Sequence, residues 1–225
     1  FDPATNTPGT LTIFGTLVNA GTLNNVTGGG VYNCCYGGTL TNTGTLNNFA
    51  GARLATWHLS NTGTLNNFAG ASWSYTEGIV VNSIGGTLNN FGTVVGGQDT
   101  LTNGGTLNNF GSWQDSFGSS LTNSVGATLN NHGLLDNYYG NLANAGKVNN
   151  YAGATLINGN LSNTGTLTNA GTVNNYGVVN AGTVVNTGVI TGFPIFSNLG
   201  NYIQTAGLTI NNGAMKRMMT ISYKK

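Results

Sequence analysis

The sequence predicts an all-β fold, a parallel β-helix (β-solenoid) with about three short strands in each coil of roughly 19–23 residues. Three observations predict it. A hexapeptide of the form Gly-Thr-Leu-Asn-Asn-Phe recurs along the chain, and between Gly44 and Gly165 its successive copies begin 19 to 23 residues apart. Within each copy, apolar residues alternate with polar ones, which is the two-residue period of a β-strand. Repetition of this length is typical of solenoids, in which each coil packs only on its neighbours.

Three repeated units make up each coil. Identical copies of the hexapeptide begin at Gly44, Gly63, Gly86 and Gly105, and looser copies begin at Ala127, Gly146 and Gly171. A related unit, such as Leu40-Thr41-Asn42, precedes each copy. A further apolar column follows it and contains Leu54, Trp73, Val94, Trp113, Leu135 and Leu156. We therefore expect three strands per coil.

The alternation also assigns a direction to each position of the hexapeptide. We expect a leucine ladder in the core, made of Leu46, Leu65, Leu88, Leu107 and Leu129. The second asparagine is expected to face inward as well, at Asn48, Asn67, Asn90, Asn109 and Asn131. Since coils stack about 4.8 Å apart, each amide can bond to its copy in the next coil.

An aromatic column and a series of glycines complete the unit. Phe49, Phe68, Phe91 and Phe110 are expected to stack, with His132, Tyr151 and Tyr176 continuing the column. Glycine is expected to supply the positive φ that the corners need.

The first threonine and the first asparagine of the unit are expected to face solvent. This candidate interaction face contains Thr45, Asn47, Thr64, Asn66, Thr87, Asn89, Thr106, Asn108, Thr128 and Asn130, and Lys147 interrupts its threonine column. A flat, uncharged lattice of this kind is similar to the faces of ice-binding β-solenoids. A solvated face or a surface for lateral packing in a fibre would have the same composition.

The repeats divide the chain into three parts. Residues 1–14 are expected to form an N-terminal entry or cap segment, residues 15–188 the solenoid, and residues 189–225 a C-terminal cap or intersubunit interface. The last part holds four of the six basic residues, and we expect an assembly tail at Lys216, Arg217, Tyr223, Lys224 and Lys225. The open end of a solenoid presents unpaired strand edges that invite another chain.

Composition excludes several classes of partner. Only 5% of the residues are charged and the net charge is +1, so the chain has no electrostatic attraction for nucleic acid or an anionic membrane. No apolar run approaches the roughly 18 residues that a membrane span requires. The neighbouring Cys34 and Cys35 favour neither a disulfide scaffold nor a zinc site. They would link subunits if exposed in an oxidising compartment, or form a loop bulge.

Catalytic chemistry has little support. Asp115 and Asp136 follow the third apolar column on successive coils. Such a pair serves glycoside hydrolysis or binds calcium, although carboxylates on separate loops are the simpler interpretation. Aromatic residues in the variable segments suit stacking on sugars, on a neighbouring subunit or over loops; they are Trp57, Tyr75, Phe117, Tyr138 and Tyr139. We expect no enzyme activity, no catalytic residue, no metal and no cofactor.

The pattern Gly-Thr-Leu-x-Asn-x-Gly-Thr-Leu-Asn-Asn, over about residues 10–190, resembles the haemagglutinin-type repeats of secreted bacterial exoproteins. Filamentous haemagglutinins and autotransporter passenger domains belong to this group. The resemblance implies a right-handed parallel β-helix that is exported to the cell surface and is often adhesive.

The sequence therefore predicts a non-enzymatic extracellular structural protein, a subunit or segment of a bacterial surface fibre or adhesin that assembles through its open solenoid ends. The expected partners are other copies of the chain and a host or environmental glycan or surface, with no nucleic acid and no membrane insertion. Ice binding through the Thr/Asn ladder is the alternative. Carbohydrate binding or processing is a second alternative.

Overall fold

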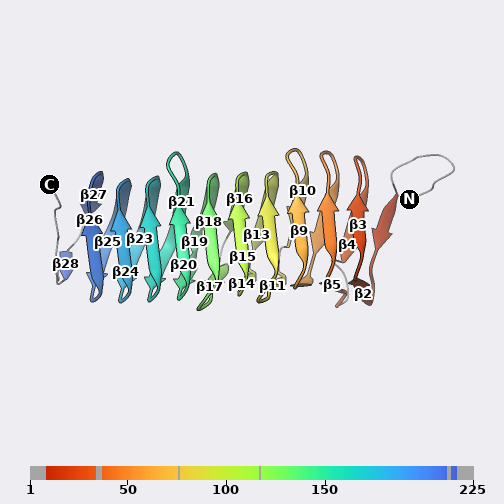
Figure 1. Ribbon diagram of the computed structural model, residues 1–225, viewed down its shortest axis with the longest axis horizontal. Coiled ribbons are helices and arrows are strands. Elements are labelled where there is room, and N and C mark those ends of the chain that lie inside the picture. Colours follow the sequence, from red (N-terminus) through yellow and green to blue (C-terminus); the bar gives the residue numbers. More distant parts are fainter. Residues whose placement is uncertain (1–8, 34–36, 76, 117, 212–213, 217–225) are drawn as a thin grey trace.

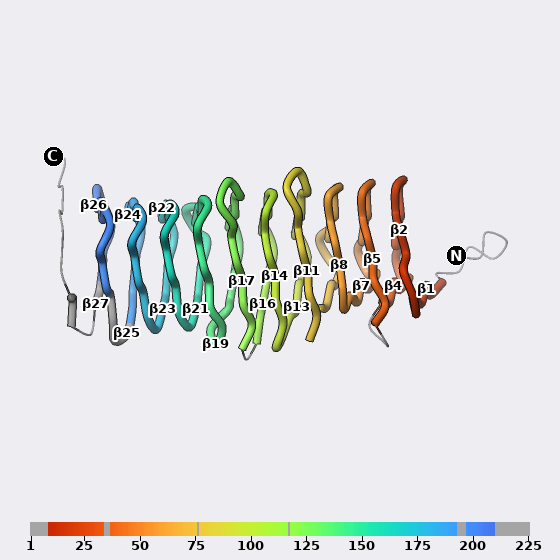
Figure 2. The backbone as a smooth tube through the Cα atoms, turned by 90° about the horizontal axis from the view of Figure 1, so that it is seen from below, coloured from red at the N-terminus to blue at the C-terminus, as the bar shows by residue number. Residues whose placement is uncertain are grey.

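A computed structural model describes residues 9–33, 37–75, 77–116, 118–211 and 214–216. These residues form 28 β-strands and no helix, and every strand pair is parallel. The strands stack side by side along one axis, with β3 near one end of the rod and β26 near the other (Figures 1 and 2). The predicted all-β parallel solenoid is confirmed. The right-handedness of the solenoid stays a prediction.

The hexapeptides that begin at Gly44 through Gly146 form the central column, a ten-stranded sheet, whereas the copy that begins at Gly171 lies in the other sheet. Its strands are β3 (Thr22–Asn25), β6 (Thr45–Asn48), β9 (Thr64–Asn67), β12 (Thr87–Asn90), β15 (Thr106–Asn109), β18 (Thr128–Asn131), β20 (Lys147–Asn150), β22 (Thr166–Asn169), β24 (Thr183–Asn186) and β26 (Asn201–Gln204). Equivalent residues of successive coils lie in register, so Leu88 pairs with Leu65 and Leu107.

Two further columns share an 18-stranded sheet. The leading column precedes each hexapeptide and contains β2 (Thr16–Asn19), β5 (Thr39–Asn42), β8 (His58–Asn61), β11 (Ile79–Asn82), β14 (Thr100–Asn103) and β17 (Ser120–Asn123). The trailing column follows each hexapeptide and contains β1 (Thr10–Thr12), β4 (Gly30–Asn33), β7 (Arg53–Thr56), β10 (Ser72–Ser74), β13 (Thr93–Gly97) and β16 (Ser112–Ser116).

Later strands run through the corner between these two columns. They are β19 (Leu134–Asn144), β21 (Thr155–Asn163), β23 (Thr172–Asn180) and β25 (Val189–Asn198). Only two residues separate the central strand β22 from β23, whereas four separate β20 from β21, so stacked asparagines from Asn163 onward are only 17 or 18 residues apart. Pairing continues through β27 (Leu208–Asn211) and β28 (Ala214–Lys216), both of which pair with β25. At the other end, β1 pairs with β4.

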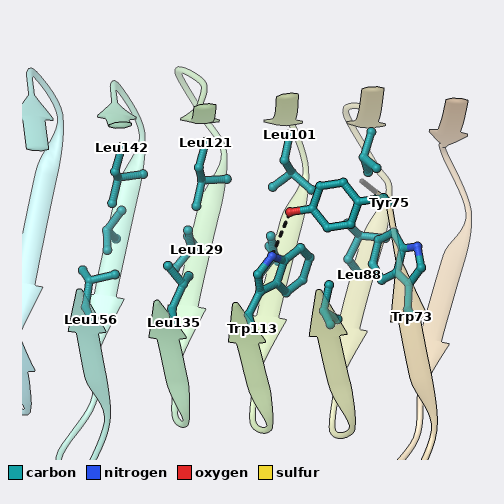
Figure 3. Packing of buried hydrophobic residues seen from close by; sticks show 14 of the residues in the cluster. Trp73, Tyr75, Leu88, Leu101, Trp113, Leu121, Leu129, Leu135, Leu142 and Leu156 are labelled. Atoms are coloured by element: carbon teal, nitrogen blue, oxygen red, sulfur yellow. Dashed lines mark hydrogen bonds between the residues drawn. The ribbon is translucent and has the colours of Figure 1, made fainter. Parts of the chain in front are cut away.

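The core is a narrow apolar column inside the coils. The leucine ladder of the central column is buried along its length, and Leu101, Leu121, Trp73 and Trp113 pack against it from the other columns (Figure 3). Alternation within four-residue strands is sufficient to build this core, because each coil contributes one large apolar side chain from each column.

Two interior ladders of asparagine run parallel to the core. In the leading ladder, each Nδ2 donates to the Oδ1 of the next coil at 2.6–2.8 Å, through Asn19, Asn42, Asn61, Asn82, Asn103, Asn123, Asn144, Asn163, Asn180 and Asn198. The central ladder does the same at 2.7–2.8 Å, through Asn25, Asn48, Asn67, Asn90, Asn109, Asn131, Asn150, Asn169 and Asn186. The predicted asparagine ladder is confirmed, and a second one stands beside it.

The expectation about glycine at the corners is corrected. Positive φ occurs at glycines such as Gly70 and Gly85, but not at Gly44, Gly63 or Gly105, which begin the hexapeptides. A Cβ on Gly63 would overlap the carbonyl oxygen of Gly44, and one on Gly105 would overlap that of Gly86. These glycines are therefore required by the close approach of one coil to the next.

Candidate functional site

The candidate interaction face is the outer surface of the central column. Its threonines and first asparagines are half-buried, and the asparagines form a third ladder. In this outer ladder each Nδ2 donates to the Oδ1 of the preceding coil at 2.8–2.9 Å, through Asn149, Asn130, Asn108, Asn89, Asn66, Asn47 and Asn24. The outer amides therefore point in the direction opposite to the interior ones.

This face is regular and uncharged over six coils. Threonines from Thr22 to Thr128 pair in register, and the column is interrupted at Lys147, which lies between Thr128 and Thr166. Since the amides bond to one another, the lattice is held rigid before any ligand arrives.

The aromatic column lies at the corner after the central strands. The rings of Phe49, Phe68, Phe91, Phe110, His132 and Tyr151 are stacked, with centroids 3.9–6.3 Å apart and planes within 11°. Their faces cover one another, so solvent reaches mainly the ring edges. Sugar rings stack on aromatic faces, so this column is poorly suited to bind them.

A cleft of about 370 Å³ opens near the corner after the trailing column. Its lining contains Gly96, Asp115, Asp136, Tyr138 and Tyr139, together with Val95, Gln114 and Ser116. Asp136 pairs in register with Gln114, one position before Asp115. The two aspartates expected to be neighbours do line one cleft, but Asp115 is buried whereas Asp136 is half-buried.

Asp115 belongs to a buried polar cluster inside the coil. The Tyr75 hydroxyl donates to Asp115 Oδ1 at 2.7 Å, and Trp113 Nε1 lies 2.9 Å from the Tyr75 hydroxyl (Figure 3) and 3.2 Å from Asp115 Oδ1. Burial raises the pKa of Asp115 to about 7, with a smaller contribution from the charge of Asp99. Burial, followed by the charges of Asp115 and Asp99, raises the pKa of Tyr75.

Asp99 is the second buried carboxylate. It is 5% exposed, and its Oδ2 accepts the backbone N–H of Gly97. Burial raises its pKa. The residue before it, Gln98, has a positive φ of 54°, a conformation that non-glycine residues seldom adopt. The charge of Asp99 affects the pKa of Asp115 more than the charge of Asp136 does, so the close acidic pair is Asp99 with Asp115.

The remaining variable aromatic residues fall into different environments. Tyr75, expected among the surface aromatic residues, is buried. Trp57 is half-buried, stacks on His58, and donates from Nε1 to the carbonyl oxygen of Glu77 at 2.7 Å. The ring of Tyr138 packs edge-on against Tyr139 and Tyr176. The expectation that Tyr176 continues the aromatic column is wrong, because Tyr176 lies on β23, outside the central column.

Several predicted residues cannot be placed. Phe117, Cys34 and Cys35 lie outside the described residues, as do Arg217, Tyr223, Lys224 and Lys225 of the assembly tail. Lys216 ends β28.

The N-terminal end of the rod is distinguished by its glycines. Gly21, which directly precedes β3, is the first glycine of the column that continues in Gly44 and Gly63. Gly15 directly precedes β2. A Cβ on Gly15 or Gly21 would meet no atom within 4 Å, and neither residue has a positive φ. In the described part of the rod, no neighbouring atom would exclude a side chain at these two positions.

Comparison of the chain with protein families, with curated proteins and with solved structures finds no match. The described residues contain no helix long and apolar enough to cross a membrane. Nor do they contain a group of three or more histidine, cysteine, aspartate or glutamate side chains placed to hold a metal ion.

Proposed function

We propose that this chain is a structural, non-enzymatic solenoid, a subunit or segment of an extracellular surface fibre, and that further coils stack on its N-terminal end. The observation that carries the proposal is the terminal glycine Gly21, at which a Cβ would meet no atom within 4 Å. Where a two-residue corner precedes the central strand, the carbonyl oxygen of the corner glycine accepts a backbone N–H of the next coil, as from Thr45 to Gly21 and from Thr64 to Gly44, both at 2.8 Å. In such corners the next glycine, as at Gly44 and Gly63, has no room for a Cβ, whereas Ala127 follows a longer corner.

The same requirement would apply to Gly21, which follows a two-residue corner, if another coil lay above it. A coil of a second copy, stacked head to tail, would supply it. The carbonyl oxygen of the residue before the central strand of that coil would accept the Thr22 N–H, as it does between coils within the rod. Contacts of this head-to-tail kind do not close on themselves, so they generate a filament.

The two interior asparagine ladders are oriented so that they can continue into an added coil. Asn19 and Asn25 donate toward the C-terminal end of the rod, which leaves their Oδ1 atoms at the N-terminal end to accept from an added coil. The resemblance of the repeats to those of secreted bacterial exoproteins supports a location outside the cell, and the near-absence of charge suits close packing of rods.

The substitution Gly21→Ala tests this proposal. We expect the wild-type chain to form rods longer than one molecule, and Gly21→Ala to give single rods with an unchanged melting midpoint, because its Cβ obstructs only an added coil. Electron microscopy and sedimentation velocity would measure the length. Gly177→Ala is the matched control, since a Cβ there meets only the Asn160 side chain. Wild-type rods that stay single at all concentrations, or Gly21→Ala rods as long as the wild type, would contradict the proposal.

Ice binding is the second candidate, favoured by the rigid outer lattice of threonine and locked asparagine amides. The double substitution Thr87→Lys and Thr106→Lys places two charges in its centre. If the face binds ice, thermal hysteresis of the wild type should be lost in this variant and kept in Thr102→Lys with Thr122→Lys, which alters outward positions of the leading column. Absence of hysteresis in the wild type would exclude this function.

A further inference from the structure

The carboxylates of Asp99 and Asp115 converge on one glycine. Gly96 lies opposite Asp115 in the pairing of β13 with β16. A Cβ on Gly96 would overlap Asp99 Oδ2 on one side and Asp115 Oδ1 on the other. The absence of a side chain at this position therefore allows two acidic side chains from neighbouring coils to share one small space.

This acidic pair lacks a counter-charge. Asp99 and Asp115 are 5% and 6% exposed. Asp99 Oδ1 is buried with no hydrogen-bond partner, and the nearby Ser119 hydroxyl donates to the carbonyl oxygen of Ser116 at 2.7 Å. Of the basic residues whose side chains the structure describes, Arg53 lies on β7 and Lys147 on β20, away from β13 and β16. A buried carboxylate oxygen without a partner is costly, so this position favours a cation.

The cleft leads from solvent to Asp115, the member of the pair that lies in its lining. Gly96 and Asp115 lie in its lining, and Asp136 adds a half-buried carboxylate to the same lining. Its volume of about 370 Å³ accommodates an ion that keeps several of its waters.

We propose that Asp99 and Asp115 bind a divalent cation of the calcium type, which enters through this cleft. Calcium takes oxygen ligands and tolerates irregular geometry. The Asp99 and Asp115 carboxylates, whose Oδ2 and Oδ1 atoms converge at Gly96, would be the anionic ligands, and water would fill most remaining positions. With so few protein ligands, we expect a dissociation constant on the order of 10⁻⁴–10⁻³ M, as in extracellular calcium modules. The ion would join the corner between β13 and β14, which holds Asp99, to β16, which holds Asp115.

Terbium(III) is a suitable probe because Trp113 Nε1 lies 3.2 Å from Asp115 Oδ1. Excitation of tryptophan should give saturable terbium emission that calcium displaces. Calcium at millimolar concentration should also raise the melting midpoint relative to the protein in EDTA. Asp99→Asn and Asp115→Asn, which are nearly isosteric, should each lose both effects, whereas Glu77→Gln, at an exposed carboxylate outside the cluster, should keep them.

Two results would overturn the proposal. Wild-type protein without saturable terbium emission and without a calcium-dependent midpoint binds no cation here. Equal calcium responses in the wild type and in both asparagine variants would place the ion elsewhere. If either variant fails to fold, the other variant and calcium displacement of terbium from the wild type still decide the question.

Discussion

Asn90→Leu should lower the free energy of unfolding by several kcal/mol although leucine nearly matches asparagine in shape. Asn90 Nδ2 donates to Asn109 Oδ1 at 2.8 Å and to the Ser112 carbonyl oxygen at 3.1 Å. Its Oδ1 accepts from Asn67 Nδ2 at 2.8 Å and from the Gly92 N–H at 3.1 Å. Leucine removes all four bonds, each of which contributes about 0.5–1.5 kcal/mol. The Gly92 N–H and Asn67 Nδ2 keep the carbonyl oxygens of Asn67 and Thr93, but Asn109 Oδ1 loses its ladder donor, and a buried unsatisfied group costs about 1–3 kcal/mol more.

Asn89→Leu is the matched control for this prediction. Asn89 bonds only to its neighbours in the outer ladder, where water can replace the lost partner. Urea denaturation should therefore show a large fall in the midpoint for Asn90→Leu and a fall of about 1 kcal/mol or less for Asn89→Leu. Equal effects would mean that the interior ladder contributes no more than a surface one.

Asp115 should make the rod less stable as pH rises through neutrality. Its folded-state pKa is about 7, above the ordinary value of 3.8, so between these values the folded chain holds a proton that the unfolded chain has released. The resulting stabilisation is complete below about pH 4 and is lost by about pH 8. A shift of this size corresponds to at most about 4 kcal/mol, and the raised pKa of Asp99 acts in the same direction.

Urea denaturation at pH 5 and pH 8, in EDTA so that no divalent cation intervenes, measures this dependence. The wild type should be more stable at pH 5. Asp115→Asn should remove most of the difference and should be the more stable protein at pH 8, because asparagine still accepts the Tyr75 hydroxyl without a charge. A wild-type stability that is flat or rises with pH would contradict the prediction.

The sequence predicted the repeated part of the molecule and not the part with the most unusual chemistry. Leu88 and Asn90 could be assigned because stacked coils place like residues above one another, so one hexapeptide determines the environment of all its copies. Asp99, Gly96 and Tyr75 belong to corners that vary from coil to coil. These corners have no period to follow. Nothing in the sequence therefore indicated that Tyr75, which precedes Asp115 by 40 positions, would donate to its carboxylate.

The glycines show a different limit of sequence reasoning. A glycine at a corner predicts positive φ, and this is correct for Gly85 but not for Gly63. At Gly63 the cause is the carbonyl oxygen of another coil. A contact between residues 19 positions apart is visible only when the spacing of the coils is known. The same knowledge is what makes Gly21 informative.

The orientation of the amide ladders gives the rod an electric moment. Sheets have little net dipole of their own, but two interior ladders point their N–H groups toward the C-terminal end, and only one outer ladder points the other way. The uncompensated ladder leaves the C-terminal end partly positive and the N-terminal end partly negative. Copies joined end to end would add their moments, whereas rods lying side by side would attract each other when they run in opposite directions.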